Sequence, residues 1–159
     1  KGIRSDIIES SLSSFNIDQI NKIYKKSLTL NKIINKEIGS NIISSYKRAS
    51  NILEQELKNN EFEISNTTDP ALFKNEYEKN LYKKINELRK YFINLNINEN
   101  YEITLTNLAD SKKIVFEFFD NVIVNDADKT IKKNRLELLS MLCKTFDNYI
   151  IFSNIETLK

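Results

Sequence analysis

The chain has 159 residues, with 24 lysines and arginines against 22 aspartates and glutamates and a formal net charge of +2 at pH 7. This near balance excludes a global basic field that draws in nucleic acid, so an RNA-binding surface would need local segregation of charge. The sequence holds no histidine and one cysteine, which excludes a histidine-based triad, an internal disulfide and a cysteine metal cluster.

The length predicts one domain over residues 1–159, large enough for a real core. With two glycines and one proline, the sequence has few of the residues that form hairpin turns, which favours helices joined by polar loops. We therefore predict an all-α bundle of about six to seven helices, with a short extended crossing near residues 121–125. The chain begins at Lys1 without methionine, so we expect a fragment of a longer subunit from an A+T-rich genome. No apolar run is long enough to span a membrane, and we expect no membrane partner.

Apolar spacing predicts helices over residues 3–14 and from a cap at Asn16 or Asp18 to about residue 36. A third helix follows Gly39, with Ser40 or Asn41 as its cap. Its inner face carries Ile42, Tyr46, Ala49, Leu53 and Leu57.

The opposite face of this third helix is a polar strip that combines cations with amides. Its candidate RNA-binding residues are Lys47, Arg48, Asn51, Gln55 and Lys58. Lysine and arginine hold phosphates, and asparagine or glutamine reads base edges. The alternative is an ordinary solvated helix face.

Two further helices are predicted over residues 69–94 and 101–109. Asp69 and Pro70 are suited to starting the first of them, as cap and first helical residue. Asp110 or Ser111 then caps a helix that leads into Phe118 and Phe119.

The crossing after these phenylalanines and the last helix form the most informative stretch. Asp126 and Asp128 are candidate caps of that helix. Arg135 falls on its apolar stripe, where a guanidinium needs a paired carboxylate, and Asp120, Asp126 and Asp128 are close enough in sequence to supply one. We expect a charge-locked corner whose structural residues are Asp120, Asp128, Asn134 and Arg135. In the first turns of the same helix, Lys129, Lys132 and Lys133 are candidate phosphate contacts or solvated lysines.

The string FFDNVIVNDADKTIKKNRLELLSML resembles the end of the DALR-type anticodon-binding domain found in the β subunit of bacterial glycyl-tRNA synthetase. The matching pattern is Phe-Phe-Asp-x-Val-x-Val, an acidic turn, and Asn-Arg-Leu-x-Leu-Leu. The segments 46–53 (YKRASNIL) and 69–73 (DPALF) resemble two further stretches of that domain, in the family's order. The four residues that name the domain type do not occur as a string here.

This resemblance implies recognition of the anticodon stem-loop of tRNA-Gly rather than aminoacylation chemistry. It implies that the parent enzyme is a cytoplasmic, ATP- and Mg-dependent glycine–tRNA ligase with an α2β2 assembly, whose α subunit activates glycine. We expect no catalytic residue, metal or cofactor in this fragment, and no DNA partner. Two alternatives stay open: a non-catalytic helical docking module of the synthetase, and the equivalent domain of an arginyl- or cysteinyl-tRNA synthetase.

Overall fold

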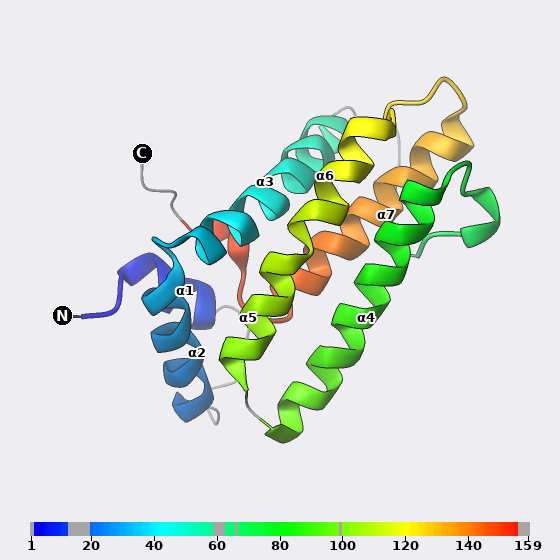
Figure 1. The fold of residues 1–159 in the computed structure, drawn as a ribbon. Helices are drawn as coiled ribbons and strands as arrows, with labels where there is room; N and C mark the ends of the chain where they lie inside the picture. Colours follow the sequence, from blue (N-terminus) through cyan, green and yellow to red (C-terminus); the bar gives the residue numbers. More distant parts are fainter. Residues whose placement is uncertain (1, 13–19, 59–62, 66, 99, 156–159) are drawn as a thin grey trace.

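A computed structural model describes residues 2–12, 20–58, 63–65, 67–98 and 100–155, with residues 12 and 94–98 described by their backbone alone. The predicted caps Asn16 and Asp18 lie outside these ranges. The described residues form seven α-helices and two short 3-10 helices without a strand (Figure 1), which confirms the all-α prediction. The helices are α1 (Ser5–Leu12), α2 (Ile20–Ile33), α3 (Glu37–Leu57), η2 (Pro70–Leu72), α4 (Glu76–Asn98), α5 (Tyr101–Asp110), α6 (Lys112–Asn121), α7 (Lys129–Asp147) and η3 (Phe152–Asn154).

Helix α7 lies at the centre of the core and packs against α3 and α4. It is buried around most of its circumference, because Leu136, Leu138, Leu139 and Met141 are each at most 4% exposed although they point in different directions around the helix. The predicted stripe on this helix was therefore too narrow. Cys143 is buried in this core, and desolvation raises the pKa of its thiol to about 12.

Helix α3 begins earlier than predicted, because Gly39 lies inside its first turn rather than before it. A Cβ built on Gly39 would lie 2.4 Å from the Ile34 carbonyl oxygen and 2.5 Å from that of Ile33. The glycine thus permits the close approach of α3 to the end of α2. Lys36 is the N-cap and makes no side-chain capping bond, so the predicted caps Ser40 and Asn41 are wrong.

The prediction that Asp69 and Pro70 start a long helix was also wrong, since these residues begin only the short helix η2. The Asp69 side chain does cap that turn, by accepting a hydrogen bond from the Ala71 amide. Helix α4 begins at Glu76, where Asn75 and Glu78 form a reciprocal capping box.

The crossing between α6 and α7 covers residues 122–128, and we call it the corner segment. Val122 and Val124 are buried on either side of an exposed Ile123, which is the alternation of an extended chain. The short extended crossing was therefore predicted correctly, with its end three residues too early. In Figure 1 the corner segment lies at the same end of the molecule as the C-terminal half of α3.

Candidate nucleic-acid interface

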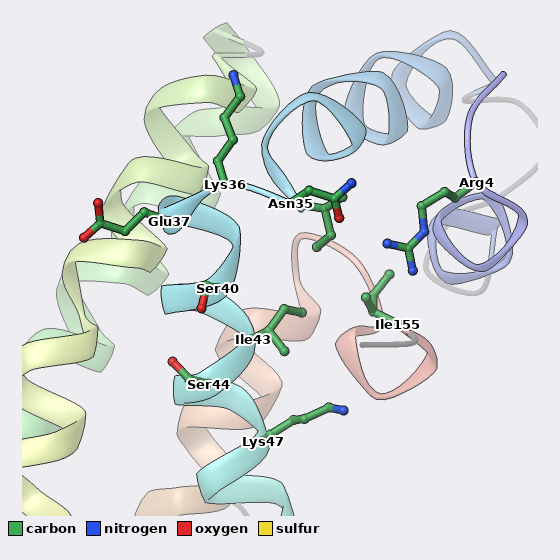
Figure 2. A pocket seen from close by; sticks show the side chains of 10 residues that line it. Arg4, Asn35, Lys36, Glu37, Ser40, Ile43, Ser44, Lys47 and Ile155 are labelled. Carbon is green, nitrogen blue, oxygen red and sulfur yellow. The ribbon is translucent and has the colours of Figure 1, made fainter. Parts of the chain in front are cut away.

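The predicted polar strip of α3 divides into two parts that face different neighbours. Lys47 lines a pocket of about 580 Å³ at the start of α3, together with Arg4 and Ile155. In Figure 2 the Arg4 and Lys47 side chains extend from opposite sides toward Ile155. The Arg4 guanidinium is already bound by both carboxylate oxygens of Asp6, at 2.6 and 3.1 Å. Lys47 is thus separated from the rest of the strip, and its RNA contact stays a prediction.

Arg48 faces α6, where its guanidinium carbon lies 4.9 Å from the ring centre of Phe116 and 4.8 Å from that of Phe119. Its Nη2 donates a hydrogen bond of 3.2 Å to the Asp120 carboxylate. Both side chains of this pair are solvent-accessible, at 36% and 64% exposure. Stacking on two rings holds the guanidinium in one orientation while leaving N–H groups available to a phosphate or a base.

Asn51 and Gln55 in the C-terminal half of α3, and Lys58 at its C-cap, are exposed. Their exposure agrees with the predicted strip and is equally consistent with a solvated face. Glu56, on another side of the helix, is partly buried and turned toward α7. The accessible part of this half therefore carries the cation–amide combination predicted from the sequence, with Glu54 at its flank.

Of the three lysines at the start of α7, Lys129 and Lys133 are exposed, whereas Lys132 is buried. The Lys132 ammonium lies 2.7 Å from the Glu56 carboxylate, with side-chain exposures of 10% and 12%. The expectation that Lys132 projects into solvent is wrong, because α7 packs against α3 at this point and a carboxylate of α3 meets the lysine. Phosphate contact therefore stays a prediction for Lys129 and Lys133 alone.

Arg135 is the buried centre of the corner, as predicted, but two of its three partners were not foreseen. Its Nε donates to Glu78 at 2.7 Å, and its Nη1 donates to Asp126 at 2.6 Å and to the Ile123 carbonyl oxygen at 2.8 Å. A hydrogen bond from the Asp128 amide, and then the bond from Arg135, lower the pKa of Asp126. Asp120 was wrongly assigned to this lock, since α6 directs its carboxylate to Arg48.

Glu78 is fully buried, and its second oxygen accepts hydrogen bonds from the amides of Lys74 at 2.6 Å and Asn75 at 3.1 Å. The carboxylate therefore caps α4 and neutralises Arg135 at the same time. The Asn75-x-x-Glu78 spacing is a capping-box pattern from which this helix start could have been predicted. It was missed because Asp69 and Pro70, earlier in the chain, were assigned as the start of the helix.

Asp128 and Asn134 have structural roles, as predicted, but they act at different places in the fold. The Asp128 carboxylate caps α7 by accepting from the Thr130 and Ile131 amides. Asn134 binds the Asp69 amide at 2.7 Å and the Thr68 hydroxyl at 2.8 Å through one oxygen, and so fastens the segment before η2 to α7. Glu137, which sequence reasoning missed, holds the same segment through the Ser65 amide at 2.7 Å.

Within the described part of the chain, no group of three or more histidine, cysteine, aspartate or glutamate side chains is arranged to hold a metal ion. Over the same residues no helix is both long and apolar enough to cross a membrane. Tyr46 was predicted to lie on the inner face of its helix, and this is confirmed by its 5% exposure; its hydroxyl donates a hydrogen bond of 3.2 Å to Asp147.

Exposed cations and amides occur at one end of the molecule, on the C-terminal half of α3, in the corner segment and in the first turns of α7. Two contacts between helices, Arg48–Asp120 and Lys132–Glu56, fasten the C-terminal half of α3 to both sides of the corner segment. We call this end of the molecule the corner face. Its accessible residues are Arg48, Asn51, Gln55, Lys58, Asn121, Ile123, Asn125, Lys129 and Lys133. Such a surface is suited to a flexible polyanion with unpaired bases.

The chain is similar to one described family and to several named proteins. A family model described as the DALR anticodon binding domain matches residues 42–159. The chain is similar to the glycine--tRNA ligase beta subunit of Rickettsia prowazekii (strain Madrid E), with 34% identity over 127 residues, 80% of this chain and 18% of that protein. The Rickettsia typhi (strain ATCC VR-144 / Wilmington) protein of the same name is also 34% identical over 127 residues, with the same coverage of both chains. The subunit of Rickettsia bellii (strain OSU 85-389) is 33% identical over 126 residues, 79% of this chain and 18% of that protein. The chain thus spans about a fifth of the length of these relatives.

Proposed function

The chain belongs to the DALR anticodon-binding domain family, and from this premise we propose that it recognises the anticodon arm of tRNA-Gly as one domain of a glycine–tRNA ligase. The observation that carries the proposal is the corner face, where Arg48, Lys129, Lys133 and several amides are accessible at the same end of a molecule whose net charge is only +2. Local concentration of cations is what an RNA surface needs when the whole molecule is nearly neutral.

Within this surface the roles follow from chemistry and placement. Lys129, Lys133 and Lys58 anchor phosphates, because a lysine ammonium is a mobile point charge. The Arg48 guanidinium is held in one plane by Phe116 and Phe119 and by Asp120. It is therefore suited to bind a phosphate or a base in a defined orientation.

Asn51 and Gln55 carry amides that donate and accept, which is the requirement for reading an unpaired base edge.

The proposal extends to the parent protein, whose activity the similarity to the Rickettsia subunits supports. The chain is part of a β subunit that works with an α subunit in an α2β2 assembly in the cytoplasm. That enzyme uses ATP and Mg to attach glycine to tRNA-Gly, and this domain contributes RNA recognition rather than catalytic groups.

Fluorescence anisotropy with a labelled tRNA-Gly anticodon stem-loop tests the proposal, with a stem-loop of replaced anticodon as the second ligand. We expect tighter binding to the glycine anticodon and a loss of that preference in Arg48→Ala/Asn51→Ala. Equal affinity for the two loops would contradict anticodon recognition and leave only phosphate attraction, which carries no sequence information.

Two double variants, which each remove two lysines, test where the phosphate contacts lie. Lys129→Ala/Lys133→Ala should reduce the salt dependence of binding, since each phosphate contact to a single strand contributes a slope of about −0.7 in log K against log salt. Lys83→Ala/Lys90→Ala removes the same charge from α4 and should leave that slope much closer to the wild-type value. Equal effects of the two pairs would contradict the location of the surface.

A further inference from the structure

The most exposed large apolar side chain among the described residues is Ile123, at 77% exposure. It lies in the corner segment between Val122, at 6%, and Val124, at 8%, so its two neighbours anchor the segment in the core while Ile123 points outward. A single exposed isoleucine is ordinary on a protein surface, and further observations are needed to give it a role.

The backbone that presents Ile123 is fixed from both sides. Its own carbonyl oxygen accepts a hydrogen bond of 2.8 Å from the buried Arg135, and the Val122 amide donates to Phe118 at 2.8 Å. On the C-terminal side of Ile123, the Asp126 amide donates to the Val124 carbonyl oxygen at 3.0 Å, and the Asp126 carboxylate also binds Arg135. The buried Arg135–Glu78 pair thus positions a short segment whose outward side chain is apolar.

The chemistry around Ile123 favours RNA over an apolar protein surface. Asn121 and Asn125, two residues away on either side, are exposed amides, and the Asn121 side-chain amide nitrogen donates to the Glu117 carbonyl oxygen at 2.8 Å, which leaves its oxygen toward solvent. Lys129 and Lys133 are exposed in the first turns of the adjoining helix, and Lys74 is near enough for its charge to lower the pKa of Asp126, after the hydrogen bonds of Asp128 and Arg135. The carboxylates of the corner segment are occupied, Asp126 by Arg135 and Asp128 by the start of α7.

We propose that Ile123 is the apolar platform on which the face of an unpaired base of the anticodon loop packs, with Asn121 and Asn125 beside it for the base edges. This inference rests on the proposed function and adds a residue that neither the cationic strip of α3 nor the lysines of α7 include. Single-stranded RNA loops are bound by such a combination, in which an apolar surface covers a base and cations hold the flanking phosphates. A rigid platform lowers the conformational cost of ordering the loop.

The test is anisotropy with the tRNA-Gly anticodon stem-loop at several salt concentrations, for the wild-type chain, Ile123→Ala and Ile93→Ala. Ile93 is 68% exposed on α4 and provides a matched change of an exposed isoleucine. We expect Ile123→Ala to weaken binding about ten-fold, as loss of a buried apolar contact does. The salt slope should stay at the wild-type value because no charge is removed. Ile93→Ala should bind as the wild type does, and the unfolding free energies of both variants should equal that of the wild type.

The outcomes separate this inference from the function on which it rests. Wild-type binding that Ile123→Ala leaves unchanged would overturn the platform and leave anticodon recognition intact. Failure of the wild type to bind the stem-loop would overturn both. A variant that keeps its RNA affinity yet no longer co-elutes with the α subunit would assign Ile123 to protein docking and overturn the platform.

Discussion

Arg135 is a single side chain that joins three segments of the chain. Its guanidinium binds Glu78 at the start of α4, Asp126 in the corner segment and the Ile123 carbonyl oxygen. A buried ion pair of this kind adds little net stability compared with apolar residues of similar volume, because both charges lose their hydration. Its contribution here is positional, since it fixes the backbone that carries Ile123.

The Arg135→Ala variant should lose about 3–5 kcal/mol of unfolding free energy, because it leaves the fully buried Glu78 carboxylate without its cation. Urea denaturation measures the loss. The double variant Glu78→Gln/Arg135→Met should be more stable than Arg135→Ala alone, since it removes both charges. The control is Asp120→Asn, which breaks only the exposed pair with Arg48 and should cost less than about 1 kcal/mol. A larger loss in Asp120→Asn than in Arg135→Ala would contradict the assignment of partners.

Lys26 of α2 is another buried cation that joins two elements of the fold. Its ammonium donates to the Tyr149 carbonyl oxygen at 2.8 Å and reaches that of Asn148 at 3.4 Å, so it meets the C-terminal end of α7. Burial, and to a lesser extent the charge of Lys22, lowers the pKa of Lys26 to about 7. The unfolded value is about 10.4.

Between these two values the unfolded chain binds the proton that the folded chain has lost, so the free energy of unfolding rises with pH. From pH 7 to 9 the wild type should gain about 2 kcal/mol relative to Lys26→Met. Below pH 7 Lys26 is charged in both states and this difference is constant. Urea denaturation of both proteins at pH 6, 7 and 9 measures this difference in unfolding free energy. The titration of groups that both proteins share cancels in the difference. Parallel stability curves would contradict a lowered pKa for Lys26.

At the scale of elements, apolar spacing was sufficient to predict the helices, because each helix buries a face of regular period. The inner residues Ile42, Tyr46, Ala49 and Leu53 of α3 are buried as predicted, while Leu57 is 40% exposed near the end of the helix. Helix starts were less predictable. Gly39 was interpreted as a break, whereas it is a close approach between two helices, which depends on tertiary packing.

Charge pairing was likewise predictable only in part, for partners that are close in sequence. The sequence showed that Arg135 needed a carboxylate, and Asp126 was among those considered. Glu78 lies 57 residues away, and Glu56, the partner of Lys132, lies 76 residues upstream of it. Local sequence cannot reveal which distant helix brings such a carboxylate close. For this reason Lys132 was grouped with its exposed neighbours.

The whole molecule places its candidate RNA surface at one end, where α3, α6 and α7 meet (Figure 1). Residues from three separate helices and the corner segment contribute, so only the strip of α3 and the lysines of α7 could be predicted from periodicity. The exposure of Ile123 became evident only when Val122 and Val124 were both found in the core.

An NMR titration of the ¹⁵N-labelled chain with the tRNA-Gly anticodon stem-loop, and with a stem-loop of replaced anticodon, tests whether the chain recognises the glycine anticodon through the corner face. We expect the largest shifts on the amides of Arg48, Asn51, Gln55, Ile123 and Lys133, with smaller shifts for the replaced anticodon. Shifts that concentrate on α1, α2 or the C-terminal half of α4, or that are the same for both loops, would contradict this recognition.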